Sequence, residues 1–373
     1  MSRLPTWESI FRGLLTRAGV EVDGARPYDF KVRDARVYRR VLLDPGLAFG
    51  ESYMDGWWDC DQLDELVAKL LRSRVDRMVP HLGHPFLDLA SRVSNLQSRR
   101  RAPKVAESHY DLDSEIFRRM LDRRMVYTCA YWRDADTLDA AQEAKLDLIC
   151  RKLELQPGMR LLDIGCGFGP LMRFAAERYG AHCVGYSLSK EQTRVGRELC
   201  RGLPVEFRLE DYRAITGTFD RVVSVEMIEA VGHRNLRTFM QTVAKAMSDD
   251  GVFLLQGMAS NTTKTQIDPW FHKYIFPNGE LPSMAQLGRA SEDLFTFEDC
   301  HNFGPDYDKT LLAWHARFMA AWPILKARHS ERFRRMWEFY LLAFAGSFRA
   351  RTVDLWQIVM TKPGRRPPLA RLT

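Results

Sequence analysis

The residues from Leu161 to Gly169 carry the clearest chemical signal in the sequence. They read LLDIGCGFG, so an apolar run ends in the acid Asp163 and is followed by a turn that contains Gly165, Gly167 and Gly169. Glycine allows a tight turn and a close approach of the backbone to a ligand. Open α/β sheets bind ligands at the carboxyl ends of their strands. We therefore predict a cofactor site at this turn.

Two classes of cofactor compete for this site. A dinucleotide site favours the pattern GxGxxG, which leaves a helix N-terminus free for a pyrophosphate. Here Pro170 stands where a third phosphate-facing glycine is expected. The DxGxG form resembles motif I of class I methyltransferases, whose ligand, S-adenosylmethionine, contains no phosphate. We favour S-adenosylmethionine over a dinucleotide and over a tight turn that binds nothing.

Polar residues after the next two expected strands would complete the cofactor site. The second strand ends at Ser187 rather than at the acid that usually holds the ribose hydroxyls, and we expect Ser187 and Gln192 to supply those hydrogen bonds. Asp211 and Tyr212 follow the third strand, where such enzymes often place a polar residue against adenine. The alternative for Asp211 is an ordinary turn acid. The predicted cofactor set is completed by Tyr127, Thr128 and Leu188.

Strands and helices must alternate to position these residues. The expected strands are Arg160–Ile164, Cys183–Tyr186, Val205–Leu209, Arg221–Val225 and Val252–Leu255. Amphipathic stretches between them predict helices at Leu171–Tyr179, Lys190–Arg201 and Asn235–Met247. Strands separated by helices of this length are typical of βαβ units and a parallel sheet. The predicted fold is an α/β, Rossmann-like doubly wound sheet of the class I methyltransferase type, with a smaller, mainly helical N-terminal domain.

The predicted domain division follows from changes in composition. Residues 1–95 contain helical stretches broken by Gly, Pro and Asp turns, and we assign them to the N-terminal domain. Residues 96–107 are polar and basic around a proline, which is typical of a linker. Residues 108–373 form the predicted catalytic domain. Within it, residues 261–343 read mainly as helices and loops, and Leu355–Thr361 is expected to return as a late edge strand.

The composition limits the class of protein. With 46% hydrophobic and 28% charged residues, the 373-residue chain is neither disordered nor fibrous. Its formal charge of +7 suits an anionic partner, and nucleic acid and anionic lipid headgroups fit equally well. Seven cysteines without CxxC spacing favour a reducing compartment and argue against a zinc site or a disulfide framework, and we expect no metal. No apolar run reaches the ~20 residues of a membrane span, and the first residues do not read as a signal peptide. We expect a cytoplasmic protein.

Motifs spread from about Gly50 to Lys362 resemble one family, the cyclopropane fatty acid synthases. The resemblance is closest to the bacterial members that modify phospholipids, because the extended N-terminal region is present. The segments that carry it, in their order along the chain, are GESYMDGWWDCDQLD, SHYDLD, YTCAYW, AQEAKLDLICRKLELQPGMRLLDIGCGFG, SVEMIEAVGH, DPWFHKYIFPNGELPS, HNFGPDYDKTLLAWHARFMAAWP and FRAR.

The resemblance implies a reaction and its substrates. S-adenosylmethionine would donate a methyl group to a cis double bond in an unsaturated phospholipid acyl chain. The resulting carbocation would lose a proton, and a cyclopropane ring would close. Bound bicarbonate is the base that the family implies. The protein would work at an anionic membrane surface on the inner face of the membrane, as a homodimer, with lipid-binding insertions in its catalytic domain and no nucleic-acid partner.

Four residues match the bicarbonate shell that the resemblance implies, and a fifth, Gln256, departs from it. Cys129, Glu229 and Tyr307 align with its side chains, and the backbone of Met258 falls where the family offers an amide. Many relatives have a histidine where this chain has Gln256, which can donate a hydrogen bond but cannot titrate. Glu229 beside an anion makes sense if burial keeps it protonated. Taken alone, Glu229 reads equally well as a helix-start acid, and Cys129 as a core thiol.

Two further groups of residues, one aromatic and one basic, each allow two interpretations. Aromatic residues near the motifs either pack in the core or line an acyl tunnel: Tyr127, Tyr131, Trp132, Trp270, Tyr274, Phe276 and Trp314. Basic residues late in the chain either form a solvated helix face or rest against anionic headgroups, together with Phe333 and Trp337. They are Lys326, Arg328, Arg332, Arg334 and Arg335.

Three other functions remain open from the sequence. One is a methyltransferase with a substrate other than lipid, such as RNA, although no RNA-binding module is recognisable. Another shares the carbocation but yields a methyl-branched or methylene lipid, an outcome that Gln256 keeps open. The third is a lipid-binding homologue with a decayed site, against which the intact glycine turn argues.

Overall fold

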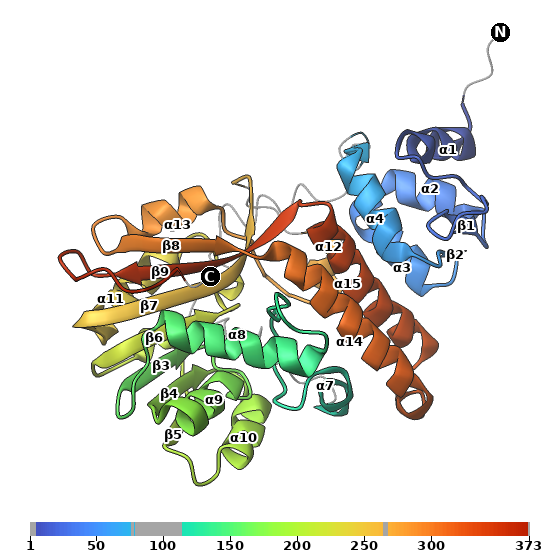
Figure 1. Ribbon diagram of the computed structural model, residues 1–373. Helices are drawn as coiled ribbons and strands as arrows, with labels where there is room; N and C mark the ends of the chain where they lie inside the picture. The colour runs from blue at the N-terminus through green and yellow to red at the C-terminus, as the bar shows by residue number, and fades with distance from the viewer. Residues whose placement is uncertain (1–4, 76–77, 79–113, 264–267, 372–373) are drawn as a thin grey trace. The chain divides into compact units, whose positions relative to one another are not determined.

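The computed structural model describes residues 5–75, 78, 114–263 and 268–371 (Figure 1). The predicted linker, residues 96–107, and the SHYDLD motif lie outside the described residues. The chain divides into two compact units. The first comprises Met1–Ser94, Gln266–Pro277 and Tyr307–Val353, and the second Asn95–Thr265, Asn278–Asp306 and Asp354–Thr373. The predicted boundary between residues 95 and 108 stays a prediction.

A seven-stranded sheet organises the second unit, in the order β5-β4-β3-β6-β7-β9-β8 (Figure 1). The pairs β5–β4, β4–β3, β3–β6 and β6–β7 are parallel, and β8 pairs antiparallel with β9. The predicted α/β fold with a parallel sheet is confirmed. The strands are β3 (Arg160–Ile164), β4 (His182–Ser187), β5 (Val205–Leu209), β6 (Phe219–Val225), β7 (Met247–Ser260), β8 (Thr296–Asn302) and β9 (Val353–Thr361).

One detail of the sheet prediction was wrong. Leu355–Thr361 was expected at an edge, but β9 lies between β7 and β8, and β8 is the edge strand. The strand β8 was missed altogether, because TFEDCHN mixes acids, a histidine and an asparagine with few apolar residues. Its pairing with β9 therefore depends on backbone hydrogen bonds at a sheet edge more than on an apolar face.

Capping side chains mark where several helices of this unit begin. Thr137 caps α8 (Leu138–Lys152), Ser189 caps α10 (Lys190–Leu199), and Ser283 forms a capping box on α13 (Met284–Ser291). Each cap satisfies a backbone N–H that has no partner within the first turn of a helix. The remaining helices of the unit are α7 (Ser114–Met120), α9 (Pro170–Tyr179), α11 (Leu236–Ala246) and the short 3-10 helices η2 (Tyr212–Ala214) and η3 (Ile228–Ala230).

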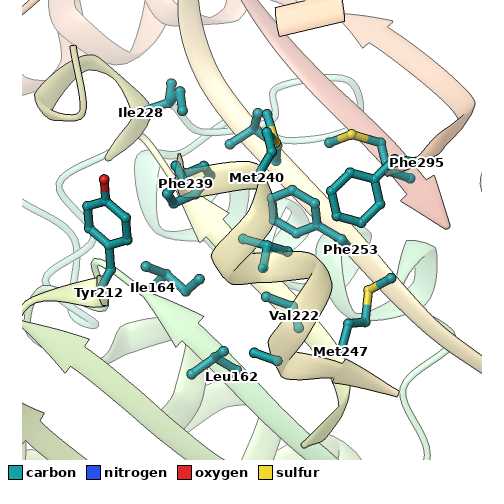
Figure 2. Packing of buried hydrophobic residues seen from close by; sticks show 14 of the residues in the cluster. Leu162, Ile164, Tyr212, Val222, Ile228, Phe239, Met240, Met247, Phe253 and Phe295 are labelled. Carbon is teal, nitrogen blue, oxygen red and sulfur yellow. The ribbon is translucent and has the colours of Figure 1, made fainter. Parts of the chain in front are cut away.

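Two apolar clusters cover the two faces of the sheet. Side chains alternate between faces along a strand, so Leu162 packs in one cluster and its neighbour Leu161 in the other. The first cluster contains residues of α11 and α13, and the second contains residues of α8 and α9. Figure 2 shows the first cluster, in which Phe239 of α11 packs against Phe253 of β7 at a centroid distance of 6.4 Å. The sheet is thus buried on both faces, and this packing holds the residues at the carboxyl ends of its parallel strands in place.

The first unit is helical and is assembled from distant parts of the chain. Helix α15 packs on α3 and α4, and α12 packs on α3. Arg349 of α15 ties these parts together through ion pairs with Asp64, Glu65 and Asp308. Its helices are α1 (Trp7–Arg17), α2 (Arg36–Leu43), α3 (Pro45–Met54), α4 (Leu63–Arg72), α12 (Pro269–Tyr274), most of α14 (Gly304–Leu325) and α15 (Glu331–Arg349), beside the short strands β1 (Lys31–Val32) and β2 (Trp58–Asp59). Among the described helices, none is long and apolar enough to cross a membrane.

Candidate active site

The glycine turn leaves β3 and leads directly into α9. Gly165, Gly167 and Gly169 all have positive φ angles, of +86°, +54° and +76°. A β-carbon at Gly165 would collide with Met227, and one at Gly169 with Phe207. At Gly167 the nearest atom is Nε2 of Gln192, 4.0 Å away. Two of the glycines are therefore required by packing, whereas Gly167 leaves its backbone open on the side of Gln192.

Buried charges lie beneath the turn. Burial raises the pKa of Asp163 to about 7, and the nearby Lys145 counteracts the rise. Lys145 of α8 is itself buried, and its ammonium group donates to Oγ1 of Thr128 at 2.7 Å. The side-chain amide of Gln142 donates to the Thr128 carbonyl at 2.8 Å. Helix α8 therefore fixes the segment that contains three of the predicted site residues, Tyr127, Thr128 and Cys129.

The predicted polar residues after β4 form one connected turn. Oγ of Ser187 accepts from the Ser189 amide at 3.2 Å, and Oγ of Ser189 accepts from the Gln192 amide at 3.2 Å. Leu188 lies between them and is partly exposed. The turn thereby holds the side chain of Gln192 beside Gly167, so two predicted parts of the cofactor site lie together.

The predicted residues after β5 have partners of their own. Asp211 accepts from the Arg213 amide at 2.9 Å and forms an ion pair with the Arg213 guanidinium group at 2.9 Å. Tyr212 packs edge-on against Phe239, inside the cluster of Figure 2. Its hydroxyl is buried and has no hydrogen-bond partner among the described residues. Asp211 therefore acts at least as a cap of η2, and Tyr212 as a core residue.

A second group of side chains lies at the end of β6 and beside it on β7, where Val225 pairs with Gln256. Oε1 of Glu226 accepts from the Cys129 amide at 2.9 Å and from Nε2 of Gln256 at 2.9 Å. Gln256 in turn accepts from Nε2 of Gln357 at 3.0 Å. The thiol of Cys129 is buried and donates to the Ala130 carbonyl at 3.3 Å. Two predicted residues, Cys129 and Gln256, are thus joined by Glu226, which the sequence reasoning did not select.

Glu229 lies three residues beyond Glu226, in η3. Its Oε1 accepts from the Met258 amide at 2.5 Å, and its Oε2 is buried without a partner among the described residues. Burial, with the negative charge of Glu226 as a second cause, raises the pKa of Glu229 to about 8. The raised pKa favours the protonated form of Glu229, whose proton needs an acceptor. Met258, predicted to offer its amide to an anion, donates to Glu229 in this structure.

Comparison with known proteins identifies the family. The family model described as "Mycolic acid cyclopropane synthetase" matches residues 97–358. The chain is 49% identical over 357 residues to the cyclopropane-fatty-acyl-phospholipid synthase of Escherichia coli (strain K12), covering 95% of this chain and 94% of that protein. The chain belongs to the cyclopropane-fatty-acyl-phospholipid synthase family. The family prediction made from the motifs is confirmed.

Two more relatives define the breadth of this family. The tuberculostearic acid methyltransferase UfaA1 of Mycobacterium tuberculosis is 33% identical, covering 93% of this chain and 85% of that protein. The crystal structure of the mycolic acid cyclopropane synthase CmaA1, complexed with SAH and CTAB, superposes with a TM-score of 0.65 at 32% identity. It covers 70% of this chain and 98% of that one. The predicted methyltransferase fold is therefore confirmed. The prediction that the protein is an S-adenosylmethionine-dependent enzyme is also confirmed.

Tyr307 is the family-derived site residue that belongs to the first compact unit. Its ring packs against Phe348 at 4.6 Å and against Trp314 at 6.1 Å between centroids. Cys129 and Glu229 belong to the second unit. The meeting of Tyr307 with these two residues therefore stays a prediction.

The basic residues in α15 and in the turn before it, which the sequence allowed to contact lipid headgroups, differ in their partners. Arg332 pairs with Asp55, Arg334 with Glu338, and Arg335 with Asp59. Most of this group thus stabilises the first unit internally. Lys326 is exposed in the α14–α15 turn, two residues after Ile324, which is 57% exposed.

Proposed function

We propose that the protein is a cyclopropane fatty acid synthase. It transfers a methylene group from S-adenosylmethionine to the cis double bond of unsaturated phospholipid acyl chains, through a carbocation that loses its proton to bound bicarbonate. The observation that carries this proposal is the 49% identity, over 95% of the chain, to a protein named for that activity. The glycine turn and the buried acids at the strand ends supply matching chemistry.

The residues at the glycine turn fit S-adenosylmethionine. Gly167 has an open backbone face beside the amide of Gln192, where a ligand without phosphate groups can lie close to the main chain. Ser187, held by the turn that begins α10, offers a hydroxyl at the end of β4. When bound, the cofactor supplies an electrophilic methyl group. The chain's own task here is to orient that group and exclude water.

Glu229, in η3, fits an anion that accepts a hydrogen bond. A protonated Glu229 uses Oε1 to accept from the Met258 amide, so the proton resides on Oε2, which has no protein partner among the described residues. Burying a donor without an acceptor costs about 1–3 kcal/mol. A bicarbonate oxygen would remove that cost. In this proposal Glu229, Cys129, Gln256 and Tyr307 form the anion shell, the Met258 amide positions Glu229, and bicarbonate supplies the base.

One feature favours a second product. Gln256 is an amide between Glu226 and Gln357, where a histidine would titrate. A relative that covers 93% of this chain is named "tuberculostearic acid methyltransferase UfaA1" rather than a cyclopropane synthase. A methylene lipid, formed when the same carbocation loses its proton without closing a ring, is therefore the alternative product, and a methyl-branched chain would in addition require a separate hydride donor to reduce it.

The finer predictions about partners are also proposals. An anionic membrane surface is supported by the net charge of +7 and by the exposed Ile324 beside Lys326. A hydrophobic side chain flanked by cations is the combination that binds such a surface. The homodimer rests on the family resemblance alone.

Lipid analysis of cells that express the protein tests the proposal. A cyclopropane product adds the mass of one methylene group to unsaturated chains and consumes the double bond. A methylene product adds the same mass but keeps a double bond, and a methyl-branched product carries two more hydrogens. Mass spectrometry with an olefin-specific derivatisation separates the three. Lipids unchanged relative to cells that express Gly167→Val would contradict the proposal.

A further inference from the structure

Glu226 occupies a position in the site that the reaction described above does not explain. It follows the last residue of β6 and has a φ angle of +54°, in the left-handed region that non-glycine residues rarely adopt. Its backbone amide donates to the Gln256 carbonyl at 2.7 Å, so the neighbouring strand holds this conformation. The strained backbone directs one carboxylate oxygen to both Cys129 and Gln256.

The hydrogen bonds define the orientation of Gln256. A carboxylate only accepts, so the atom of Gln256 that meets Glu226 must be Nε2. Its Oε1 is then left to accept from Nε2 of Gln357, as observed at 3.0 Å. Gln256 and Gln357 are both fully buried. The charge of Glu226 therefore sets the direction of a chain of two amides across β7 and β9.

Charges around Glu226 come from several elements. Lys145 of α8 is buried. Its strongest electrostatic interaction is with Glu226, and weaker ones follow with Cys129, Asp122 and Asp163. The charge that faces Glu229 is that of Glu226. Glu280, whose backbone amide donates to the Glu229 carbonyl at 2.9 Å, pairs its own carboxylate with His233 at 2.8 Å. Lys145 is thus a buried cation that acts on Glu226, Asp122 and Asp163, whereas Glu229 faces the like charge of Glu226.

We propose that Glu226 is a positioning residue, which holds the Cys129 backbone and the Gln256 amide in place and keeps the proton on Glu229. A negative charge beside a buried carboxyl group disfavours its ionisation, and Glu229 is the buried member of this pair. Because Lys145 and two hydrogen bonds stabilise the Glu226 carboxylate, the proton resides on Glu229. This inference rests on the proposed function, since it assigns Glu226 a role in the same reaction.

Two substitutions separate position from charge. Glu226→Gln keeps an oxygen that accepts from Cys129 and Gln256 but removes the negative charge. Glu226→Asp keeps the charge but withdraws the oxygens by one methylene group. Glu292→Gln is the matched control, because Glu292 is an exposed acid in the same unit. Melting temperature and S-adenosylmethionine affinity are measured for each protein to show that fold and cofactor site survive.

The readout is the rate of lipid modification against pH. For Glu226→Gln, the alkaline limb should move to lower pH by about one unit, because loss of a like charge allows Glu229 to ionise earlier. For Glu226→Asp, the limb should stay in place and kcat should fall about 10- to 100-fold, the scale of an ångström-sized displacement in a site. Glu292→Gln should match the wild type in both respects.

The outcomes distinguish this inference from the proposed function. A wild type that modifies no lipid contradicts the proposed function, and this inference with it. An active wild type whose alkaline limb is unmoved in Glu226→Gln, together with full activity of Glu226→Asp, overturns the role of Glu226 alone. If only one of the two variants folds, it still tests one part of the proposal. Glu226→Gln tests the effect of the charge through the alkaline limb of the pH–rate profile, and Glu226→Asp tests the effect of position through kcat.

Discussion

The two ends of the candidate site are built in different ways. At β3 and β4 the cofactor region uses backbone, with glycines in left-handed conformations and a capped turn. At β6 and β7 the acid region uses side chains, with the partly buried Glu226 accepting from Cys129 and Gln256 and the buried Glu229 accepting from Met258. In the proposed function the first end would bind the cofactor, whereas the second would control a proton. The difference predicts that substitutions at the two ends will affect different measurements.

The largest effect is expected from Gly167→Val. The substitution puts a branched side chain at φ +54° and fills the open backbone face beside Gln192. We expect S-adenosylmethionine affinity to fall about 1,000-fold or more, which is about 4 kcal/mol. Calorimetric titration measures it. Gly202→Val is the control, since Gly202 has a φ angle of +83° and nothing within 4 Å of its β-carbon position. Equal affinities in the two folded variants would refute the cofactor assignment.

Lys145→Met should affect both ends at once. Lys145 donates to Thr128 at the cofactor end and interacts with Glu226 at the acid end. Removing one partner from a buried group of charges costs about 3–5 kcal/mol. We expect the free energy of unfolding in urea to fall by about that amount. Lys245→Met, at an exposed position, is the control. A variant as stable as the control would show that Lys145 does not link the two ends.

The acid end should be sensitive to alkaline pH. Glu229 donates only while protonated, and its pKa is raised to about 8 by burial and Glu226. The rate should therefore fall up to about tenfold per unit as the pH rises through about 8. Because a raised pKa means that the folded state binds the proton, the stability this proton contributes is lost between the ordinary value of 4.5 and about pH 8.

Two measurements test the predicted direction of this pH dependence. One is kcat from about pH 6 to about pH 10. The other is the free energy of unfolding of the wild type and of Glu229→Gln over a lower range, since glutamine does not titrate. The wild type should lose stability relative to the variant as the pH rises from 4.5 to about 8. Parallel stability curves, or a rate that increases through pH 8, would contradict the assignment.

The smallest effect concerns the membrane. Binding to anionic vesicles should weaken as salt rises, because attraction between exposed charges is screened over about 8 Å at physiological ionic strength. Lys326→Glu should weaken co-sedimentation a few-fold, whereas Lys245→Glu should not. The effect is modest because Arg332, Arg334 and Arg335 are paired within the protein. Equal binding to neutral and anionic vesicles at every salt concentration would show that electrostatic attraction does not contribute to membrane binding.

The same contrast explains what could be predicted from the sequence. The cofactor turn is local: Asp163 and three glycines within seven residues identify it. The acid end is not, because Glu226 meets Gln256 only through the parallel register that pairs Val225 with Gln256. An acid after an apolar strand was a signal for Glu226, but no glycine turn follows it. Strand β8 was missed for a related reason, since its pairing depends on a partner more than 50 residues away.

The central claim is that the acid end handles the proton separately from cofactor binding. Its most direct test is the initial rate against added bicarbonate, in buffer depleted of carbon dioxide, for the wild type and Glu229→Gln. Calorimetric titration of S-adenosylmethionine accompanies both. The wild-type rate should rise with bicarbonate and saturate, while Glu229→Gln should be about 10²–10⁴-fold slower with cofactor affinity unchanged. A wild-type rate indifferent to bicarbonate, together with a fully active Glu229→Gln enzyme, would contradict the account.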